Sequence, residues 1–246
     1  MTKYVYTLSS RGIMFEHAFL SIKTLSRYVD VSEIVVFFTP PIEDIHVEKL
    51  KSLGVDVKIK NNCTDEFVAF DEPQHYGEKT WITEIEDSQV VFLDCDTFVL
   101  GDIRKALKGN FEFKAREDEK VHQPEWSKMF ERFDEPYIDW MPNAGFLIFK
   151  NNIHKKIGDT WRRYIQKDLG YSHDFNHKEQ YALALAVGEA NCVMMDSSEH
   201  AMFWKDEFPS DGMVYHSGKE LEKSSKTDLE QKSGFLRNLR KLYNFQ

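Results

Sequence analysis

The stretch Val90-Val91-Phe92-Leu93-Asp94-Cys95-Asp96-Thr97 runs four apolar residues directly into two carboxylates. A short apolar run of this kind predicts a buried strand. Residues i and i+2 of an extended chain point the same way, so we expect Asp94 and Asp96 to lie together at the end of this strand. Neighbouring like charges repel and favour a cation between them, and oxygen ligands suit Mg²⁺ or Mn²⁺. Cys95 is expected to point away from both acids into the core.

The segments before this stretch alternate between strand and helix patterns. Strands are predicted over residues 4–8, 34–38 and 55–59, and helices over residues 15–29, 42–53 and 78–85. Strands and helices in alternation predict a mostly parallel α/β sheet with helices on both faces. Ligands of such sheets bind beyond the carboxyl ends of the strands, so the functional residues are expected at one edge.

The second half of the chain is less regular but continues the α/β pattern. Strands are predicted over residues 111–115, 145–149, 193–195 and 213–215, and helices over residues 153–165 and 179–187. Residues 116–140 are charged and aromatic and include Pro124 and Pro136, which predicts a helix-containing insertion or lid. No linker composition separates the two halves. We therefore expect one domain over residues 1–246 with an elaborated second half.

Composition excludes several classes of protein. The chain has 246 residues, with 32 Lys and Arg against 41 Asp and Glu, and a formal net charge of -9. Because an acidic protein does not attract phosphate backbones, we expect no nucleic-acid partner. No apolar stretch approaches the ~18 residues of a membrane-spanning helix, and the first apolar run is too short for a secretory signal. The three cysteines (Cys63, Cys95 and Cys192) form no C-x-x-C pair, which favours a reducing compartment, the cytoplasm.

Six segments, in their order along the chain, resemble retaining glycosyltransferases of the GT-A fold. The group is that of glycogenin and the bacterial galactosyltransferases, glycosyltransferase family 8, and the resemblance runs from about Tyr4 to Lys219. The segments are Val5-Tyr6-Thr7-Leu8, Lys79, residues 91–100, Asn143-Ala144-Gly145-Phe146, Glu179-Gln180 and Tyr215-His216-Ser217-Gly218-Lys219. The resemblance implies a nucleotide-binding half over residues 1–100 and a sugar and acceptor half over residues 101–220.

The resemblance also implies roles for individual residues. Asp94, Asp96 and His216 are the implied ligands of Mn²⁺ or Mg²⁺. Donor binding is implied for Thr7, Lys79, Asp94, Asp96, Asn143, Gly145, Gln180, Gly218 and Lys219. Gln180 and Glu179 are the implied catalytic residues. Lys219 stands nearer its glycine than is usual in the family, so Arg162 and Arg163 are alternative cations.

The implied reaction moves a sugar from a nucleotide-diphospho-sugar, a UDP-sugar above all, to a carbohydrate, lipid-linked or protein acceptor. Two other functions stay open at this point. The Asp-x-Asp pattern also occurs in haloacid-dehalogenase-type phosphotransferases, where Asp94 would be the nucleophile. In that class the pattern usually follows the first strand, whereas three strand–helix units precede it here. The chain also fits a non-catalytic protein that binds nucleotide sugars.

The last residues differ from the rest in charge. Apolar residues fall on one helical face at Phe235, Leu236, Leu239, Leu242 and Tyr243, while the neighbouring charges at Lys232, Arg237, Arg240 and Lys241 are basic. This pattern over residues 221–246 predicts a basic amphipathic helix. Such a helix either makes peripheral contact with a membrane or docks on the domain.

Overall fold

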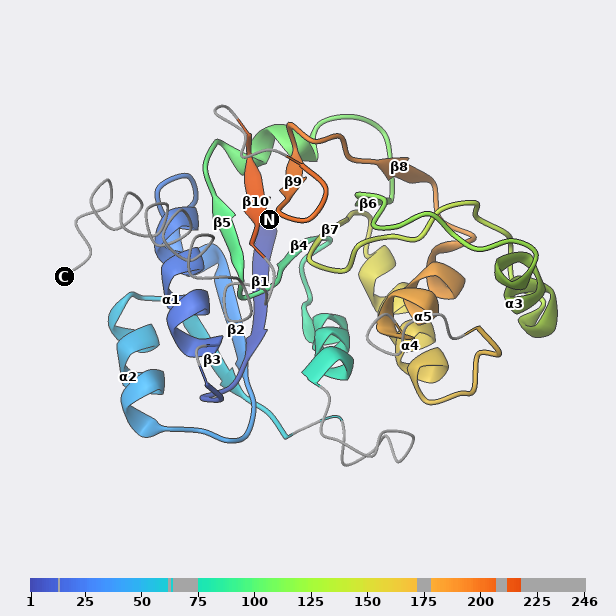
Figure 1. Ribbon diagram of the computed structural model, residues 1–246. Coiled ribbons are helices and arrows are strands. Elements are labelled where there is room, and N and C mark those ends of the chain that lie inside the picture. The colour runs from blue at the N-terminus through green and yellow to red at the C-terminus, as the bar shows by residue number, and fades with distance from the viewer. Residues whose placement is uncertain (13, 62, 64–74, 172–177, 207–211, 218–246) are drawn as a thin grey trace, which may run out of the picture.

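A computed structural model of the chain describes residues 1–12, 14–61, 63, 75–171, 178–206 and 212–217. Within these residues a seven-stranded sheet, in the order β3-β2-β1-β4-β7-β6-β8, forms the centre of the molecule, and a three-stranded sheet, in the order β5-β10-β9, lies beside it (Figure 1). None of the helices in this part of the chain has the length and apolar character needed to cross a bilayer. The predicted helix over residues 221–246 lies outside the described residues.

The first four strands of the large sheet are parallel. They are β1 (Thr2–Leu8), β2 (Ile34–Phe38), β3 (Asp56–Ile59) and β4 (Gln89–Leu93). Every residue of β2 is buried, with Val35 and Phe37 in one core cluster and the other three residues in the second. This continuous burial is typical of a parallel strand covered on both faces. The predicted parallel α/β half is therefore confirmed.

The remaining strands complete the two sheets. In the large sheet they are β6 (Phe113–Ala115), β7 (Phe146–Phe149) and β8 (Cys192–Met194), and β7 is antiparallel to both β4 and β6. The small sheet contains β5 (Thr97–Val99), β9 (His200–Met202) and β10 (Val214–His216). Because β7 runs opposite to β4, the residues just before β7 lie at the carboxyl edge of β4, where Leu93 pairs with Phe146.

Helices cover both faces of the large sheet (Figure 1). One face carries α1 (Met14–Leu25) and α2 (Asp44–Ser52), and the other carries η3 (His75–Glu84), α3 (Glu125–Phe133), α4 (Ile153–Ile165) and α5 (Lys178–Val187). Two short 3₁₀-helices lie in connections between these elements: η1 (Val31–Glu33) directly precedes β2, and η4 (Ile103–Leu107) lies between β5 and β6. The sheet is thus the middle of three layers, with a hydrophobic core on each side.

Two features of the fold differ from the prediction for physical reasons. The helix predicted over residues 78–85 is the 3₁₀-helix η3, in which the hydroxyls of Thr80 and Thr83 donate to carbonyls three residues earlier. Strands β5 and β9 are absent from the prediction, because three residues each are too few to show a period. The predicted helix within residues 116–140 is α3, and Trp126 and its helix neighbours are buried in the core that also contains residues of η3, α4 and α5.

Candidate metal and ligand site

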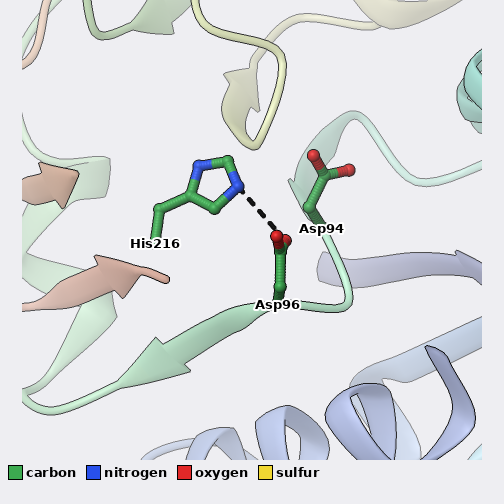
Figure 2. Close-up of side chains that lie close together, drawn as sticks. All are labelled: Asp94, Asp96 and His216. Atoms are coloured by element: carbon green, nitrogen blue, oxygen red, sulfur yellow. Dashed lines mark ion pairs between the residues drawn. The ribbon is translucent and has the colours of Figure 1, made fainter. Parts of the chain in front are cut away.

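Two carboxylates and one imidazole meet at the carboxyl edge of β4. Asp94 directly follows β4, Asp96 directly precedes β5, and His216 ends β10. One ligand atom from each residue lies within 4.8 Å of those of the other two. Figure 2 shows the three side chains gathered around one point, with the ion pair between His216 and Asp96 dashed. The structure therefore brings together the three residues that the resemblance implied as metal ligands; we call them the metal triad.

A tight turn, and not extended chain, brings the two carboxylates together. The amide and hydroxyl of Thr97 donate to the Asp94 carbonyl at 3.2 and 2.7 Å, and those of Ser217 donate to the Asp96 carbonyl at 3.0 and 2.9 Å. These hydrogen bonds turn the chain from β4 into β5. The expectation of an extended chain at Asp94 and Asp96 is therefore wrong, although the expected proximity of the two acids is found.

The residue between the two acids faces inward. The Cys95 thiol donates to the Thr7 carbonyl at 3.2 Å and packs against the core. Burial, together with the neighbouring Asp94 and Asp96 carboxylates, raises the pKa of the Cys95 thiol well above its ordinary value. Cys95 is thus a neutral packing residue, as expected, and it anchors the turn to the end of β1, where the predicted donor residue Thr7 lies.

His216 and Asp96 form a buried ion pair. The His216 Nε2 atom lies 3.1 Å from Asp96 Oδ1, and the two side chains are 7% and 18% exposed. Burial alone would lower the pKa of His216, but the carboxylates of Asp96 and Asp94 outweigh it and raise that pKa. Burial opposes ionisation of Asp96, yet the neighbouring His216 holds the pKa of Asp96 below its ordinary range. The proton between His216 Nε2 and Asp96 Oδ1 thus lies at a position where the two aspartates also attract a metal cation.

The donor set of the metal triad fits a hard divalent cation. Carboxylate oxygens and a neutral imidazole nitrogen are ligands that Mn²⁺ accepts, and Mg²⁺ prefers the oxygens. Ligands on opposite sides of Mg²⁺ at about 2.1 Å lie about 4.2 Å apart. Because the three ligand atoms lie within 4.8 Å of one another, one ion could reach all three after small movements of the side chains.

Gly145 forms the surface on which the His216 ring packs. A Cβ at this position would overlap the His216 Cε1 and Nδ1 atoms and would lie 2.9 Å from Asn143 Oδ1. The Gly145 carbonyl also accepts the Asp94 amide at 2.8 Å. The resemblance to glycosyltransferases implied that Gly145 binds the donor. The group that approaches is the imidazole, so the missing side chain creates room for a metal-triad residue.

Lys79 lies between two carboxylates at the edge of the metal triad. Its ammonium is 2.9 Å from Asp94 Oδ2 and 3.9 Å from Glu179 Oε1, and it donates to the Ala144 carbonyl at 3.3 Å. Lys79 is only 5% exposed. Because the pairing compensates the cost of burying this charge, a fixed positive charge stands beside the position of the predicted cation.

A buried carboxylate that the sequence analysis missed, Asp118, connects two of the predicted donor residues. Its Oδ2 atom accepts from Gln180 Nε2 at 2.7 Å and from Asn143 Nδ2 at 3.3 Å. At their other ends, Gln180 Oε1 accepts the Ala144 amide at 2.9 Å and Asn143 Oδ1 accepts the Gly145 amide at 2.9 Å. Both side-chain amides are therefore fixed in orientation.

No sequence pattern marks Asp118. It lies in the charged segment 116–140, and its partners Asn143 and Gln180 are 25 and 62 residues away. The contact depends on an isolated antiparallel bridge between Glu117 and Pro142, which sets the Asp118 region beside the residues before β7. Such a bridge leaves no periodic signal.

His200 lies against His216 on the side of the small sheet. The two rings are nearly parallel, with centroids 5.6 Å apart and planes 14° apart, and Phe146 meets His200 edge-on. Burial lowers the pKa of His200 well below its ordinary value, so the ring is neutral. Neither ring nitrogen has a hydrogen-bond partner in the described part of the chain. His200 was also missed by the sequence analysis.

The other predicted cations are engaged elsewhere or lie outside the described residues. Arg162 donates to the Thr80 hydroxyl at 3.0 Å and to the Thr80 carbonyl at 3.2 Å, and Arg163 pairs with Glu135. Neither therefore serves as the alternative to Lys219 in this arrangement. Gly218 and Lys219 themselves lie outside the described residues.

No protein-family model and no curated protein matches this chain, but solved structures do. An active-site mutant of the galactosyltransferase LgtC aligns with 88% of this chain and 86% of its own, at 14% identity and a TM-score of 0.62. Mouse xyloside xylosyltransferase 1 aligns over 89% and 99%, at 11% identity and a TM-score of 0.55. The glycosyltransferase GlyE of Streptococcus pneumoniae TIGR4 aligns over 89% and 56%, at 13% identity and a TM-score of 0.58.

These likenesses show the fold. The chain adopts the GT-A fold of its glycosyltransferase neighbours, as the sequence predicted. At identities of 11–14% the likeness concerns the backbone arrangement alone. The position of Asp94 argues against the haloacid-dehalogenase-type alternative, because Asp94 follows β4, which comes after β1, β2 and β3 among the described residues, and not the first strand.

Proposed function

We propose that this protein is a metal-dependent glycosyltransferase that uses a nucleotide-diphospho-sugar, a UDP-sugar above all, as donor. The single observation that carries the proposal is the meeting of Asp94, Asp96 and His216 at the carboxyl edge of β4, within a GT-A fold. LgtC has been solved with donor and acceptor sugar analogs, which supports the same two ligand classes here. The acceptor would be a glycan, a lipid-linked sugar or a protein.

In this proposal the metal triad holds Mn²⁺ or Mg²⁺, which would supply a Lewis acid to the departing nucleoside diphosphate. Lys79 adds a buried positive charge near the diphosphate, and Glu179 holds Lys79 in place from 3.9 Å. A fixed charge of this kind stabilises a developing anion without reorganisation. Thr7, at the end of β1, belongs to the same donor site, and we extend that site to Gly218 and Lys219.

The proposed transfer breaks the bond between the anomeric carbon and the diphosphate oxygen and forms a bond from the acceptor oxygen to that carbon. The acceptor proton passes to the departing diphosphate. Gln180 Oε1 keeps a second lone pair after accepting the Ala144 amide, so it can face the positive charge that develops on the sugar. Asn143 and Gly145 would line the same sugar. We propose retention of anomeric configuration, with Gln180 and Glu179 at the reacting face.

The proposal covers residues 1–246 as one catalytic domain in the cytoplasm. Two of the cysteines, Cys95 and Cys192, are thiols in the structure, which supports a reducing compartment.

The experiment that tests the function measures hydrolysis and transfer from a panel of nucleotide sugars with Mn²⁺, Mg²⁺ or a chelator. We expect Asp94→Asn and Asp96→Asn to abolish metal-dependent turnover. Asp56→Asn is the matched control, because the Asp56 side chain is 53% exposed on β3. Full turnover in the two site variants would refute the assignment. Phosphatase activity with trapping of an aspartyl-phosphate mimic would favour the phosphotransferase, and donor binding without any turnover would favour a non-catalytic binding protein.

A further inference from the structure

An exposed tryptophan stands next to the metal triad. Trp204 follows β9 and is 42% exposed, one of the few large apolar side chains that reach solvent. Its ring meets His216 edge-on, with centroids 5.0 Å apart and planes 72° apart. For an indole of up to about 250 Å², this exposure leaves on the order of 100 Å² uncovered. The open surface therefore lies at the rim of the site and not on an unrelated face.

The indole is held by a buried acid. Trp204 Nε1 donates to Asp118 Oδ1 at 3.0 Å, and Asp118 is only 4% exposed. The other oxygen of the same carboxylate accepts from Gln180 and Asn143. The neighbouring Lys205 ammonium donates to the Asp118 carbonyl at 2.8 Å, which ties the segment after β9 to the same residue. The position of the ring is thus coupled to the two amides proposed to line the sugar.

Tyr137 is an exposed aromatic side chain that has no buried carboxylate as its hydrogen-bond partner. It is 49% exposed, but its hydroxyl pairs with the side chain of Gln123, in a bond exposed to solvent. Its ring packs on Phe130 of α3. Single exposed aromatic residues are common on protein surfaces and need no function. Trp204 differs because a buried carboxylate orients it beside three potential metal ligands.

We propose that Trp204 is the stacking platform of a saccharide subsite beside the metal triad, taking the apolar face of a pyranose ring. An aromatic surface next to carboxylate and amide groups is the combination that such a ring needs, since it offers C–H bonds on its faces and hydroxyls at its edge. This inference rests on the proposed function and names its substrate class. The pyranose comes from the donor or from the acceptor, and the two sources are separable by experiment.

The test follows Trp204 directly in the full chain labelled with 5-fluorotryptophan. The chain has five tryptophans, and the resonance of Trp204 is identified by its loss in Trp204→Phe. The other four serve as internal controls. The probes are UDP with Mn²⁺, UDP-glucose and UDP-galactose with Mn²⁺, and methyl glycosides of glucose, galactose and xylose with UDP and Mn²⁺. Calorimetry measures the affinity of each probe for the wild type, Trp204→Leu and the matched control Tyr137→Leu.

We expect a saturable shift of the Trp204 resonance with at least one saccharide and about tenfold weaker binding of that saccharide in Trp204→Leu. Tyr137→Leu should bind it as the wild type does. A shift with methyl glycosides assigns the subsite to the acceptor, and a shift with UDP-sugars alone assigns it to the donor sugar.

Three results would overturn the inference: no shift with any saccharide, the full shift with UDP alone, or undiminished saccharide binding in Trp204→Leu. Failure of UDP to bind in the presence of Mn²⁺ would instead refute the UDP donor of the proposed function, while a saccharide shift would still support the Trp204 subsite.

Discussion

Gly145→Ala offers the sharpest test of how the metal triad is built. The added methyl group would overlap the His216 ring and press on Asn143 Oδ1, so the imidazole has to leave its present position beside Asp96. Overpacking of this kind costs about 1–3 kcal/mol in a well-packed interior. Displacing the support of a metal ligand typically lowers metal affinity by about 10–100-fold. We therefore expect Mn²⁺ to bind Gly145→Ala about 10–100-fold more weakly than the wild type.

The assay is calorimetric titration of Mn²⁺ into the metal-free protein, with urea unfolding as the check that the variant is folded. Gly158→Ala is a matched control, because its methyl group would overlap Thr83 Cγ2 between α4 and η3 and not a metal-triad residue. The control should lose stability but keep its Mn²⁺ affinity. If a folded Gly145→Ala bound Mn²⁺ as tightly as the wild type, His216 would not be a ligand in the way we infer.

Three further predictions concern buried polar and titratable side chains. Lys79→Met should strengthen Mn²⁺ binding several-fold and weaken UDP binding in saturating Mn²⁺, because the variant loses a buried positive charge that repels the metal ion and attracts the diphosphate. If calorimetry showed that both affinities rise or that both fall, the prediction would be contradicted. Asp118→Asn should lower the free energy of unfolding in urea by about 1–3 kcal/mol, because the amide keeps only one of the two oxygens that accept from Gln180 and Trp204. An unchanged urea midpoint would contradict this prediction. Burial lowers the pKa of His154 and His200, so only the unfolded chain gains their protons near pH 6. The contribution of these two histidines to stability should therefore be full above pH ~6.5 and fall as the pH drops below it, by at most about 1.4 kcal/mol per unit and histidine. His154→Gln should lose less stability than the wild type between pH 7 and pH 5, and equal losses in the two proteins would refute this.

The sequence predicts the centre of the large sheet well because its strands are largely buried. In β2 the five apolar residues alone identify the strand, and β1 and β4 are recognised in the same way. The carboxyl edge of these strands then places Asp94 correctly. The turn at Asp94–Asp96 is not predictable from the apolar run, because hydrogen bonds from Thr97 and Ser217 set it.

The sequence predicts β10 of the small sheet, over residues 213–215, but not β5, β9 or the pairing of these strands. His216 reaches Asp96 because β10 pairs with β5 in a register that sets His216 opposite Thr97. Strands of three residues show no period, so only the resemblance to known glycosyltransferases singled out His216. Asp118 and Trp204 had no such support. Their positions depend on contacts between distant segments, which hydrophobic patterning does not encode.

The most direct measurement is the anomalous scattering of manganese in crystals grown with Mn²⁺ and UDP. We predict one strong peak about 2.0–2.3 Å from a carboxylate oxygen of Asp94, a carboxylate oxygen of Asp96 and a ring nitrogen of His216. A crystal with bound UDP and no peak between these three side chains would contradict the account.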